Sequence, residues 1–254
     1  MSHLPRLLHI TDTHLFADPK RALRGVVTRE TLAAVLAAAR SQPHWPPTAV
    51  LATGDLSEDE SAIAYAAFAD MLGGLGVPVH CLPGNHDDPA LMQAPLTRPP
   101  FTLCASPEIG NWLVIMLSSR IAGSPAGRLG EAELARLERL LDANPARHTL
   151  VCVHHQPHPM GSLWLDRHRL ADAQEFKSIV AAHAQVRGVL WGHVHQASEQ
   201  VHDGVLWLST PSTCDQFLPG SDTFATDARP PAWRWLSLLD DGRIETELCW
   251  LGES

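Results

Sequence analysis

Side chains that can bind metal ions recur along this chain in five short motifs, each of which follows a short apolar run. Carboxylate and amide oxygens together with imidazole nitrogens suit zinc and the first-row transition metals. The candidate metal ligands are Asp12, His14, Asp55, Asn85, His154, His193 and His195. In two motifs the ligands stand two residues apart, and in an extended segment such residues point to the same side.

Seven ligands exceed the four that a zinc site normally takes. Two ions that share one bridging carboxylate would use all of them, and Asp55 is the best bridge because a carboxylate offers two oxygens. Two divalent ions outweigh the negative charges of Asp12 and Asp55, so the site would remain positive. Such a pair acidifies a bound water and neutralises phosphate oxygens. The predicted chemistry is phosphoester hydrolysis.

The apolar runs before these motifs are predicted to be strands, at residues 6–10, 49–52, 77–82, 149–153 and 186–191. Helical patterns alternate with them, at residues 28–40, 57–72, 131–142 and 172–183, and a short helix begins at Asp88-Pro89. Thr28 is predicted to cap the first helix, and Ser57 with Glu60 to form a capping box for the second. This alternation indicates an α/β protein. Because ligand sites form at the carboxyl ends of parallel strands, the five motifs are expected to meet there.

Composition and charge exclude several classes of partner and location. The 28 acidic and 19 basic residues give a net charge of −9, which argues against a nucleic-acid polymer as partner. The apolar runs are far shorter than the ~20 residues of a membrane span, and no secretory signal precedes the first strand. Five cysteines without Cys-x-x-Cys spacing favour a reducing, cytoplasmic location.

Asp203-Gly204 and Asp241-Gly242 predict antiparallel hairpins in the last third of the chain. We expect a single domain over residues 1–254, and a homodimer is one possible oligomeric state.

The motifs resemble those of the calcineurin-like metallophosphoesterases, in this order: Asp12-Thr13-His14, Gly54-Asp55, Gly84-Asn85-His86-Asp87, the segment at His154, and Gly192-His193-Val194-His195. The resemblance implies a four-layer αββα sandwich with mixed sheets and a dinuclear metal centre. One ion would be held by Asp12, His14, Asp55 and His195, and the other by Asp55, Asn85, His154 and His193. Iron with manganese is the favoured pair, with zinc or cobalt as alternatives.

Residues 10–16, 161–166 and 210–214 resemble, more narrowly, the class III bacterial cyclic-AMP phosphodiesterases. This implies hydrolysis of 3′,5′-cyclic AMP to 5′-AMP by a metal-bridging hydroxide, with the small cyclic nucleotide as partner. It also implies that Asn85 and His86 contact the substrate and that His86 protonates the departing alkoxide, a role that suits histidine near neutral pH. Trp164 is a candidate to stack on the base, against the simpler interpretation that it anchors its loop. Glu58 could orient His86, or its place in a first helical turn could reflect the helix dipole.

Alternatives remain. A broader phosphodiesterase of the same fold would use the same motifs. A binding module that has lost catalysis would show eroded ligands, whereas the seven ligands and His86 are intact. Gly54-Asp55 is not followed by the Asp and Arg of protein Ser/Thr phosphatases, which disfavours phosphoprotein substrates. Ser118-Ser119 stands where relatives often carry Asp-Ser, so a carboxylate outside the ligand set is missing.

Overall fold

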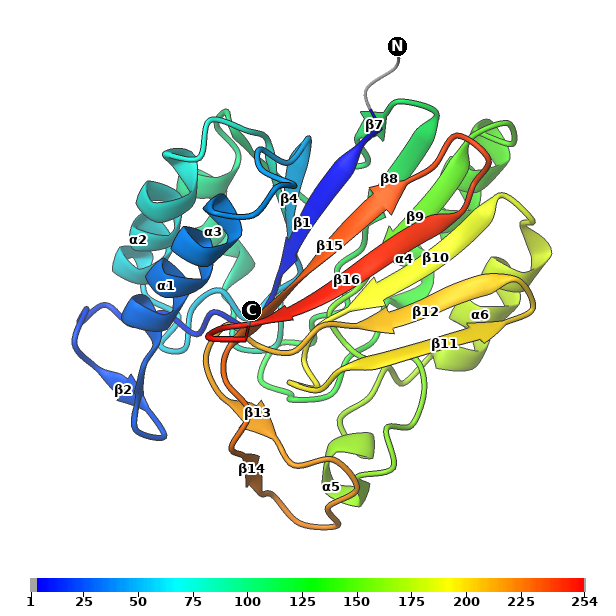
Figure 1. Ribbon diagram of the computed structural model, residues 1–254. Helices are drawn as coiled ribbons and strands as arrows, with labels where there is room; N and C mark the ends of the chain where they lie inside the picture. The colour runs from blue at the N-terminus through cyan, green and yellow to red at the C-terminus, as the bar shows by residue number, and fades with distance from the viewer. Residues whose placement is uncertain (1–3, 254) are drawn as a thin grey trace.

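The computed structural model describes residues 4–253, and two six-stranded sheets form its centre (Figure 1). The first sheet contains β1 (Arg6–Ile10), β4 (Ala49–Ala52), β5 (Val79–Cys81), β6 (Phe101–Leu103), β15 (Ala232–Leu238) and β16 (Ile244–Trp250). The second contains β7 (Glu108–Ile109), β8 (Trp112–Met116), β9 (His148–Cys152), β10 (Val186–Trp191), β11 (Ser198–His202) and β12 (Val205–Ser209). The strand orders are β16-β15-β1-β4-β5-β6 and β11-β12-β10-β9-β8-β7. Both sheets are mixed and contain four parallel strands. In the first sheet antiparallel pairings lie on one side of these strands, and in the second sheet on both sides.

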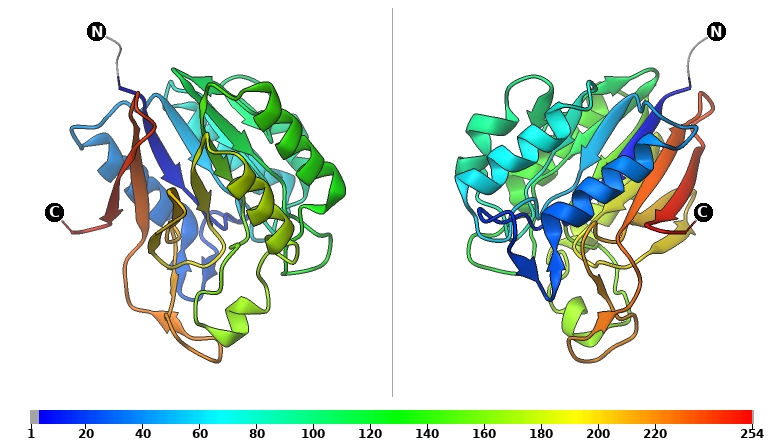
Figure 2. Two further views of the ribbon diagram at one scale, coloured as in Figure 1. Left: turned by 90° about the vertical axis from the view of Figure 1, so that its right-hand side faces the viewer. Right: turned by 60° about the vertical axis from the view of Figure 1, so that its left-hand side comes forward.

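Helices cover the outer face of each sheet (Figure 2). Those on the first sheet are α1 (Thr28–Arg40), α2 (Ala62–Gly73) and α3 (Pro89–Leu96), and those on the second are α4 (Gly130–Ala143) and α6 (Ala173–Ala182). Three buried apolar clusters match the three spaces between layers: Leu32 lies in the first, Leu137 in the second, and Leu7 with Trp112 in the one between the sheets. The predicted four-layer αββα sandwich is therefore confirmed.

The predicted strands and hairpins agree with the structure to within two residues at each end. The Asp203-Gly204 turn joins the antiparallel pair β11 and β12, and Asp241-Gly242 lies between the antiparallel pair β15 and β16. Several short elements were not predicted: β2 (Ala22–Leu23), β3 (Val26–Val27), β13 (Gln216–Phe217), β14 (Thr226–Asp227) and α5 (Leu163–Asp166). They lie at the lower end of the sandwich in Figure 1. Within residues 4–253, each helix is too short or too polar to cross a lipid bilayer.

One predicted helix start and one predicted helix cap are wrong. Asp88 caps α3 as expected, since its side chain accepts from the backbone of Ala90. The second helix, however, begins at Ala62 under a cap from Ser61, so residues 57–60 form a loop and not a capping box. Thr28 is the first residue of α1, and its hydroxyl donates to the carbonyl of His14 instead of capping the helix. The loop at residues 57–60 and the start of α1 at Thr28 therefore both lie at the edge of the sandwich where the polar motifs meet.

Candidate metal centre

The five polar motifs meet at the carboxyl ends of β1, β4, β5, β9 and β10, which belong to both sheets. The Nε2 atoms of His14 and His195 lie 3.2 Å apart, and Asp12 Oδ1 is 3.5 Å from His195 Nε2. Asp55 Oδ2 lies 3.3 Å from His154 Nε2 and 3.8 Å from His14 Nε2. Asp55 therefore stands between two groups of side chains, in the position that a bridging ligand needs.

The side chains of the five motifs converge because several of their residues adopt a backbone conformation that the sequence did not predict. Left-handed φ angles occur at five of these residues: Asp12 (54°), His14 (43°), Asp55 (51°), His193 (65°) and His195 (48°). The expectation that the paired residues share an extended segment is therefore wrong, although Asp12 Oδ1 and His14 Nε2 still lie 4.0 Å apart. Residues other than glycine adopt this conformation at a cost of order 1–3 kcal/mol, typically at functional sites. Hydrogen bonds between loops hold it here, including Asp12 N to Gly54 O at 3.0 Å and His14 N to Asp55 O at 2.9 Å.

Three imidazoles are each fixed by a hydrogen bond of 2.7 Å at Nδ1, on the side of the ring that faces away from the interior of the site. The partners are Glu58 Oε2 for His14, Thr53 O for His154 and Asp215 O for His195. Each bond leaves the Nε2 atom facing the interior of the site. Metal-binding histidines almost always have such an outer partner, which fixes the ring orientation and the tautomer.

The electrostatics of the site favour bound positive charge. Burial alone would raise the pKa of Asp55, but the neighbouring imidazoles of His154, His86 and His14 together outweigh burial and hold that pKa well below its usual range. Burial alone would lower the pKa of His14, yet Glu58 and Asp55 outweigh it and raise the pKa to about 9. His193 Nε2 is buried and has no hydrogen-bond partner among the described residues. Ionised carboxylates, facing imidazole nitrogens and an unpaired Nε2 together form a donor set that fits metal cations.

His154, and not the adjacent His155, faces Asp55. The Nδ1 atom of His155 lies 2.8 Å from Ser119 Oγ, and its ring packs 4.6 Å from the ring of His193. Burial, followed by the charge of His154, keeps the pKa of His155 well below its usual range. His155 therefore supports the ring of His193 from outside, and Ser119 of the Ser118-Ser119 pair supports His155.

Asn85 and His86 lie at the mouth of the site. Asn85 Oδ1 is 3.2 Å from His154 Nε2, and the backbone N–H of His86 donates to Asp55 Oδ1 at 2.9 Å. The His86 side chain is 39% exposed, and its Nδ1 lies 3.2 Å from Glu58 Oε2. One carboxylate oxygen of Glu58 thus serves both His14 and His86. Because Glu58 lies in a loop, the helix-dipole explanation for it is wrong, and the contact is the one that an orienting role requires.

Asp87 is a buried residue whose role the sequence did not reveal. Its carboxylate accepts from the backbone N–H groups of Gly84, Leu56 and Ser57 at 2.8–3.1 Å, which ties the third motif to the second. The tie brings Gly84 so close that a Cβ there would lie 2.0 Å from Asp55 Oδ1. The sequence signal that could have indicated this role is the position of Asp87 directly after His86 in the motif Gly84-Asn85-His86-Asp87.

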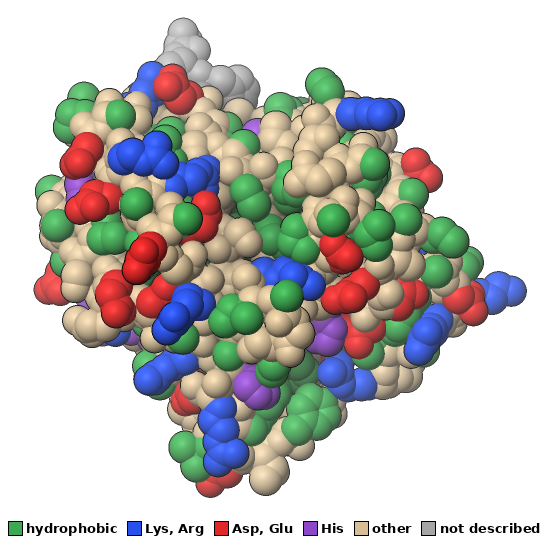
Figure 3. Space-filling view, turned by 180° about the vertical axis from the view of Figure 1, so that it is seen from behind, with side chains coloured by type: hydrophobic (Ala, Val, Ile, Leu, Met, Phe, Trp, Pro, Cys, Tyr) green, Lys and Arg blue, Asp and Glu red, His purple; other side chains and the backbone are tan. Residues whose placement is uncertain are grey.

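A cavity of about 190 Å³ adjoins the site, and Asp55, Asn85 and His86 form part of its wall. Trp164 lines it, as the base-stacking hypothesis requires, together with three residues that the sequence did not single out: Arg24, Phe217 and Phe224. The ring of Phe217 stacks on His195 at 4.1 Å, whereas Phe224 is 50% exposed. In the view from behind, histidine side chains show in a depression in the lower half of the molecule (Figure 3).

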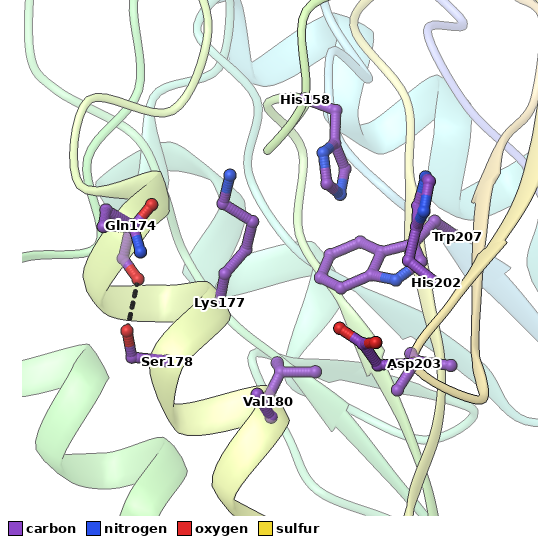
Figure 4. A pocket seen from close by; sticks show the side chains of 10 residues that line it. His158, Gln174, Lys177, Ser178, Val180, His202, Asp203 and Trp207 are labelled. Atoms are coloured by element: carbon purple, nitrogen blue, oxygen red, sulfur yellow. Dashed lines mark hydrogen bonds between the residues drawn. The ribbon is translucent and has the colours of Figure 1, made fainter.

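Another cavity, of about 290 Å³, lies between α6 and the β11–β12 hairpin (Figure 4). The His158 ring meets the Trp207 ring edge-on at a centroid distance of 4.5 Å, and Lys177 stands across the gap. Burial lowers the pKa of His158 to about 4, aided by Lys177. This cavity contains none of the predicted site residues, so the chemistry of the five motifs is confined to the edge where they converge.

The contact of Glu58 with His14 predicts an effect on metal binding. Glu58→Ala removes the acceptor that fixes the His14 ring, so the Mn²⁺ affinity should fall by about 10- to 100-fold, as measured by calorimetry on chelator-treated protein. Glu60→Ala is the matched control, because Glu60 is 53% exposed and pairs with Arg120. Equal affinities of the two variants would contradict this role of Glu58.

Comparison with known proteins agrees with this geometry. A family model described as calcineurin-like phosphoesterase matches residues 5–197. A Vibrio vulnificus protein named 3′,5′-cyclic adenosine monophosphate phosphodiesterase CpdA is 42% identical over 244 residues, which cover 96% of this chain and 89% of that protein. The Escherichia coli (strain K12) protein of the same name is also 42% identical, with coverages of 96% and 88%. A Nostoc protein named 3′,5′-cyclic-nucleotide phosphodiesterase is 35% identical, with coverages of 95% and 91%.

Solved structures share the fold at low sequence identity. A dimetal phosphatase from Danio rerio superposes with a TM-score of 0.65 at 16% identity, covering 98% of this chain and 99% of that one. The protein TT1561 of Thermus thermophilus gives a TM-score of 0.62 at 15% identity, with coverages of 96% and 99%. With the family model and the relatives above, these findings establish that the chain belongs to the calcineurin-like phosphoesterase family.

Proposed function

We propose that this protein is a metal-dependent phosphodiesterase that hydrolyses 3′,5′-cyclic AMP to 5′-AMP. The observation that carries the proposal is the convergence of Asp12, Asp55 and four imidazoles beside an exposed His86. Relatives that are 42% identical over 96% of the chain, and that are named cyclic-AMP phosphodiesterases, support the choice of substrate. We further propose that residues 1–254 act as one domain, because the site takes side chains from both sheets.

The family uses a dinuclear metal centre. We propose Asp12, His14, Asp55 and His195 as the ligands of one ion, and Asp55, Asn85, His154 and His193 as those of the other. Their nitrogen and oxygen donors suit iron with manganese, and zinc or cobalt as substitutes. When bound, the two ions would supply Lewis-acid stabilisation of the phosphate oxygens and would lower the pKa of water, so that hydroxide is available near neutral pH to attack phosphorus.

His86 is proposed to donate the proton that the leaving O3′ alkoxide needs. Glu58 engages Nδ1 of His86 at 3.2 Å, and this contact leaves Nε2 as the nitrogen available to substrate. A ribose alkoxide is a poor leaving group, so a positioned acid contributes typically about 10²–10⁴-fold to the rate. Asn85, the preceding residue, is proposed as a second substrate contact because it lines the same cavity.

Trp164 is proposed to receive the adenine base. It lines the cavity beside His86, its indole N–H makes no hydrogen bond with the described residues, and its ring meets Phe224 at 5.2 Å. Aromatic faces bind nucleobases by stacking, worth about 1–3 kcal/mol per base. A cavity wall of this kind favours a nucleotide over a phosphodiester without a planar group.

The test of the proposed function combines metal analysis of the purified protein with turnover of cyclic AMP, cyclic GMP and bis-p-nitrophenyl phosphate. We expect about two bound ions per chain, turnover of cyclic AMP, and loss of turnover after chelation that Mn²⁺ restores. Turnover of the synthetic diester with none of either cyclic nucleotide would instead favour a broader phosphodiesterase of the same fold.

The proposed role of His86 predicts a dependence on the leaving group. His86→Asn should lower kcat for cyclic AMP by about 10²-fold or more, and lower it much less for bis-p-nitrophenyl phosphate, because p-nitrophenolate leaves without a proton. Glu58→Ala should also lower kcat more for cyclic AMP than for bis-p-nitrophenyl phosphate, with a smaller decrease than in His86→Asn. Undiminished turnover of cyclic AMP by Glu58→Ala would dismiss its orienting role.

The proposed stacking on Trp164 predicts a change in KM. Trp164→Ala should raise KM for cyclic AMP by about 5- to 150-fold, the equivalent of about 1–3 kcal/mol of lost stacking, with a smaller effect on bis-p-nitrophenyl phosphate. Trp250 is a suitable control position, because it lies on the edge strand β16 away from the cavity. Equal changes in KM for both substrates would show that Trp164 only anchors its loop.

A further inference from the structure

A continuous row of buried polar side chains crosses the space between the two sheets and ends on one of the proposed metal ligands. Its members are, in order, Arg234, Thr210, His9, Thr53, Thr11 and Asp12. None of them is more than 2% exposed. The same space is otherwise filled by an apolar cluster that includes Leu7 and Leu51. Buried polar groups in such surroundings are tolerated only when each has its partner.

Every link in this row has hydrogen-bond geometry. Thr210 Oγ1 lies 3.3 Å from Arg234 Nε and 2.7 Å from His9 Nδ1. Thr53 Oγ1 lies 2.8 Å from His9 Nε2 and 2.9 Å from Thr11 Oγ1. Thr11 Oγ1 lies 2.7 Å from Asp12 Oδ2. The row joins β15 and β1 of the first sheet to the end of β12 in the second. It is therefore a polar tie between the sheets as well as a support for Asp12.

The two ends of the row fix its direction. A guanidinium only donates and an ionised carboxylate only accepts, while each threonine hydroxyl has a single proton. Thr11 must donate to Asp12, so Thr11 accepts from Thr53, and the Thr53 oxygen in turn needs a donor. From the other end, Arg234 donates to Thr210, whose hydroxyl proton is then free to point at His9.

His9 connects the two halves as a neutral ring. Burial, followed by the charge of Arg234, lowers the pKa of His9 to about 3, so the ring carries no charge near neutral pH. A neutral imidazole has one donor and one acceptor nitrogen. Its Nε2 supplies the proton that Thr53 needs, and its Nδ1 accepts the proton from Thr210.

We propose that His9, held in the Nε2–H tautomer, completes a one-way hydrogen-bond row from Arg234 to Asp12 and thereby positions the Asp12 carboxylate. Thr11 occupies Oδ2, which turns Oδ1 toward His195 Nε2 at 3.5 Å and His14 Nε2 at 4.0 Å. Aligned donors strengthen one another and stabilise negative charge at the accepting end. His9 is thus a positioning residue that acts on the site through two threonines, and the inference is independent of the substrate.

Packing at the end of the row agrees with this role. A Cβ on Gly192 would lie 2.0 Å from Thr11 Oγ1 and 2.7 Å from Asp12 Oδ2. The turn that carries His193 therefore closes directly over the last hydrogen bond, and the His193 backbone N–H donates to both carboxylate oxygens of Asp12 at 3.0–3.1 Å. With the carboxylate held on these sides, its orientation does not depend on side chains at the mouth of the site.

The first test examines the His9 ring in the unmodified protein. In nuclear magnetic resonance of ¹⁵N-histidine-labelled protein, the His9 ring should be neutral, carry its proton on Nε2 and keep that state between about pH 6 and 9, where ordinary histidines change charge. His9→Gln identifies the signal by its disappearance. A proton on Nδ1, or an imidazolium ring at His9, would overturn the proposal.

The second test interrupts the row at Thr53. Thr53→Val keeps the volume of the side chain but removes both donor and acceptor, whereas Thr53→Ser keeps the hydroxyl. Calorimetric titration with Mn²⁺ should show an affinity about 10- to 100-fold lower for the valine variant, with near wild-type affinity for the serine variant. Wild-type affinity in a folded valine variant would overturn the positioning role. Should the valine variant not fold, the tautomer measurement decides alone.

Discussion

Burial of two carboxylates side by side is the constraint on which the rest of this structure depends. Asp12 and Asp55 are almost completely removed from water, where an ionised group without compensation is very costly. The chain supplies part of the compensation to Asp12 through the Thr11 hydroxyl and the His193 N–H. Asp55 receives the N–H of His86 and faces the imidazoles of His154 and His14. The facing imidazole nitrogens and the unpartnered His193 Nε2 leave room for cations to supply the remainder. This convergence of donors on two buried carboxylates supports the proposal that cations bind here.

The two-sheet architecture follows from this constraint. Asp12 and Asp55 come from the first sheet, and His154 and His193 from the second, so the site exists only when the sheets pack together. The apolar cluster between the sheets provides the driving force for this packing, and the row through His9 adds directional contacts at the end nearest the site. Non-directional apolar packing can bring two sheets together, but it cannot set the rotation of a carboxylate, which requires hydrogen bonds. The two kinds of contact therefore have separate tasks.

Much of this arrangement could be predicted from the sequence because its cause is local. Apolar runs such as residues 49–52 form strands wherever a sheet buries both faces, and a ligand directly after such a run must lie at the carboxyl edge. Other features depend on contacts between distant segments. Ser57 and Glu60 match a capping box, yet Asp87 takes the backbone N–H of Ser57 and the helix starts later. The left-handed φ at His14 and the polar row through His9 likewise depend on partners far away in the chain, and no local pattern encodes them.

Asp12 and His14 are held from two independent directions, which explains why strained backbone is tolerated at both. Asp12 is fixed from inside the sandwich by the row that begins at Arg234, whereas His14 is fixed from the surface side by Glu58. Each residue has a positive φ, which is also held by a backbone hydrogen bond, from Asp12 N to Gly54 O and from His14 N to Asp55 O. Hydrogen bonds worth about 1–3 kcal/mol each to charged groups are comparable to the strain of one such residue. Because the two supports share no residue, loss of one leaves the other ligand in place, and the strain at each is balanced locally.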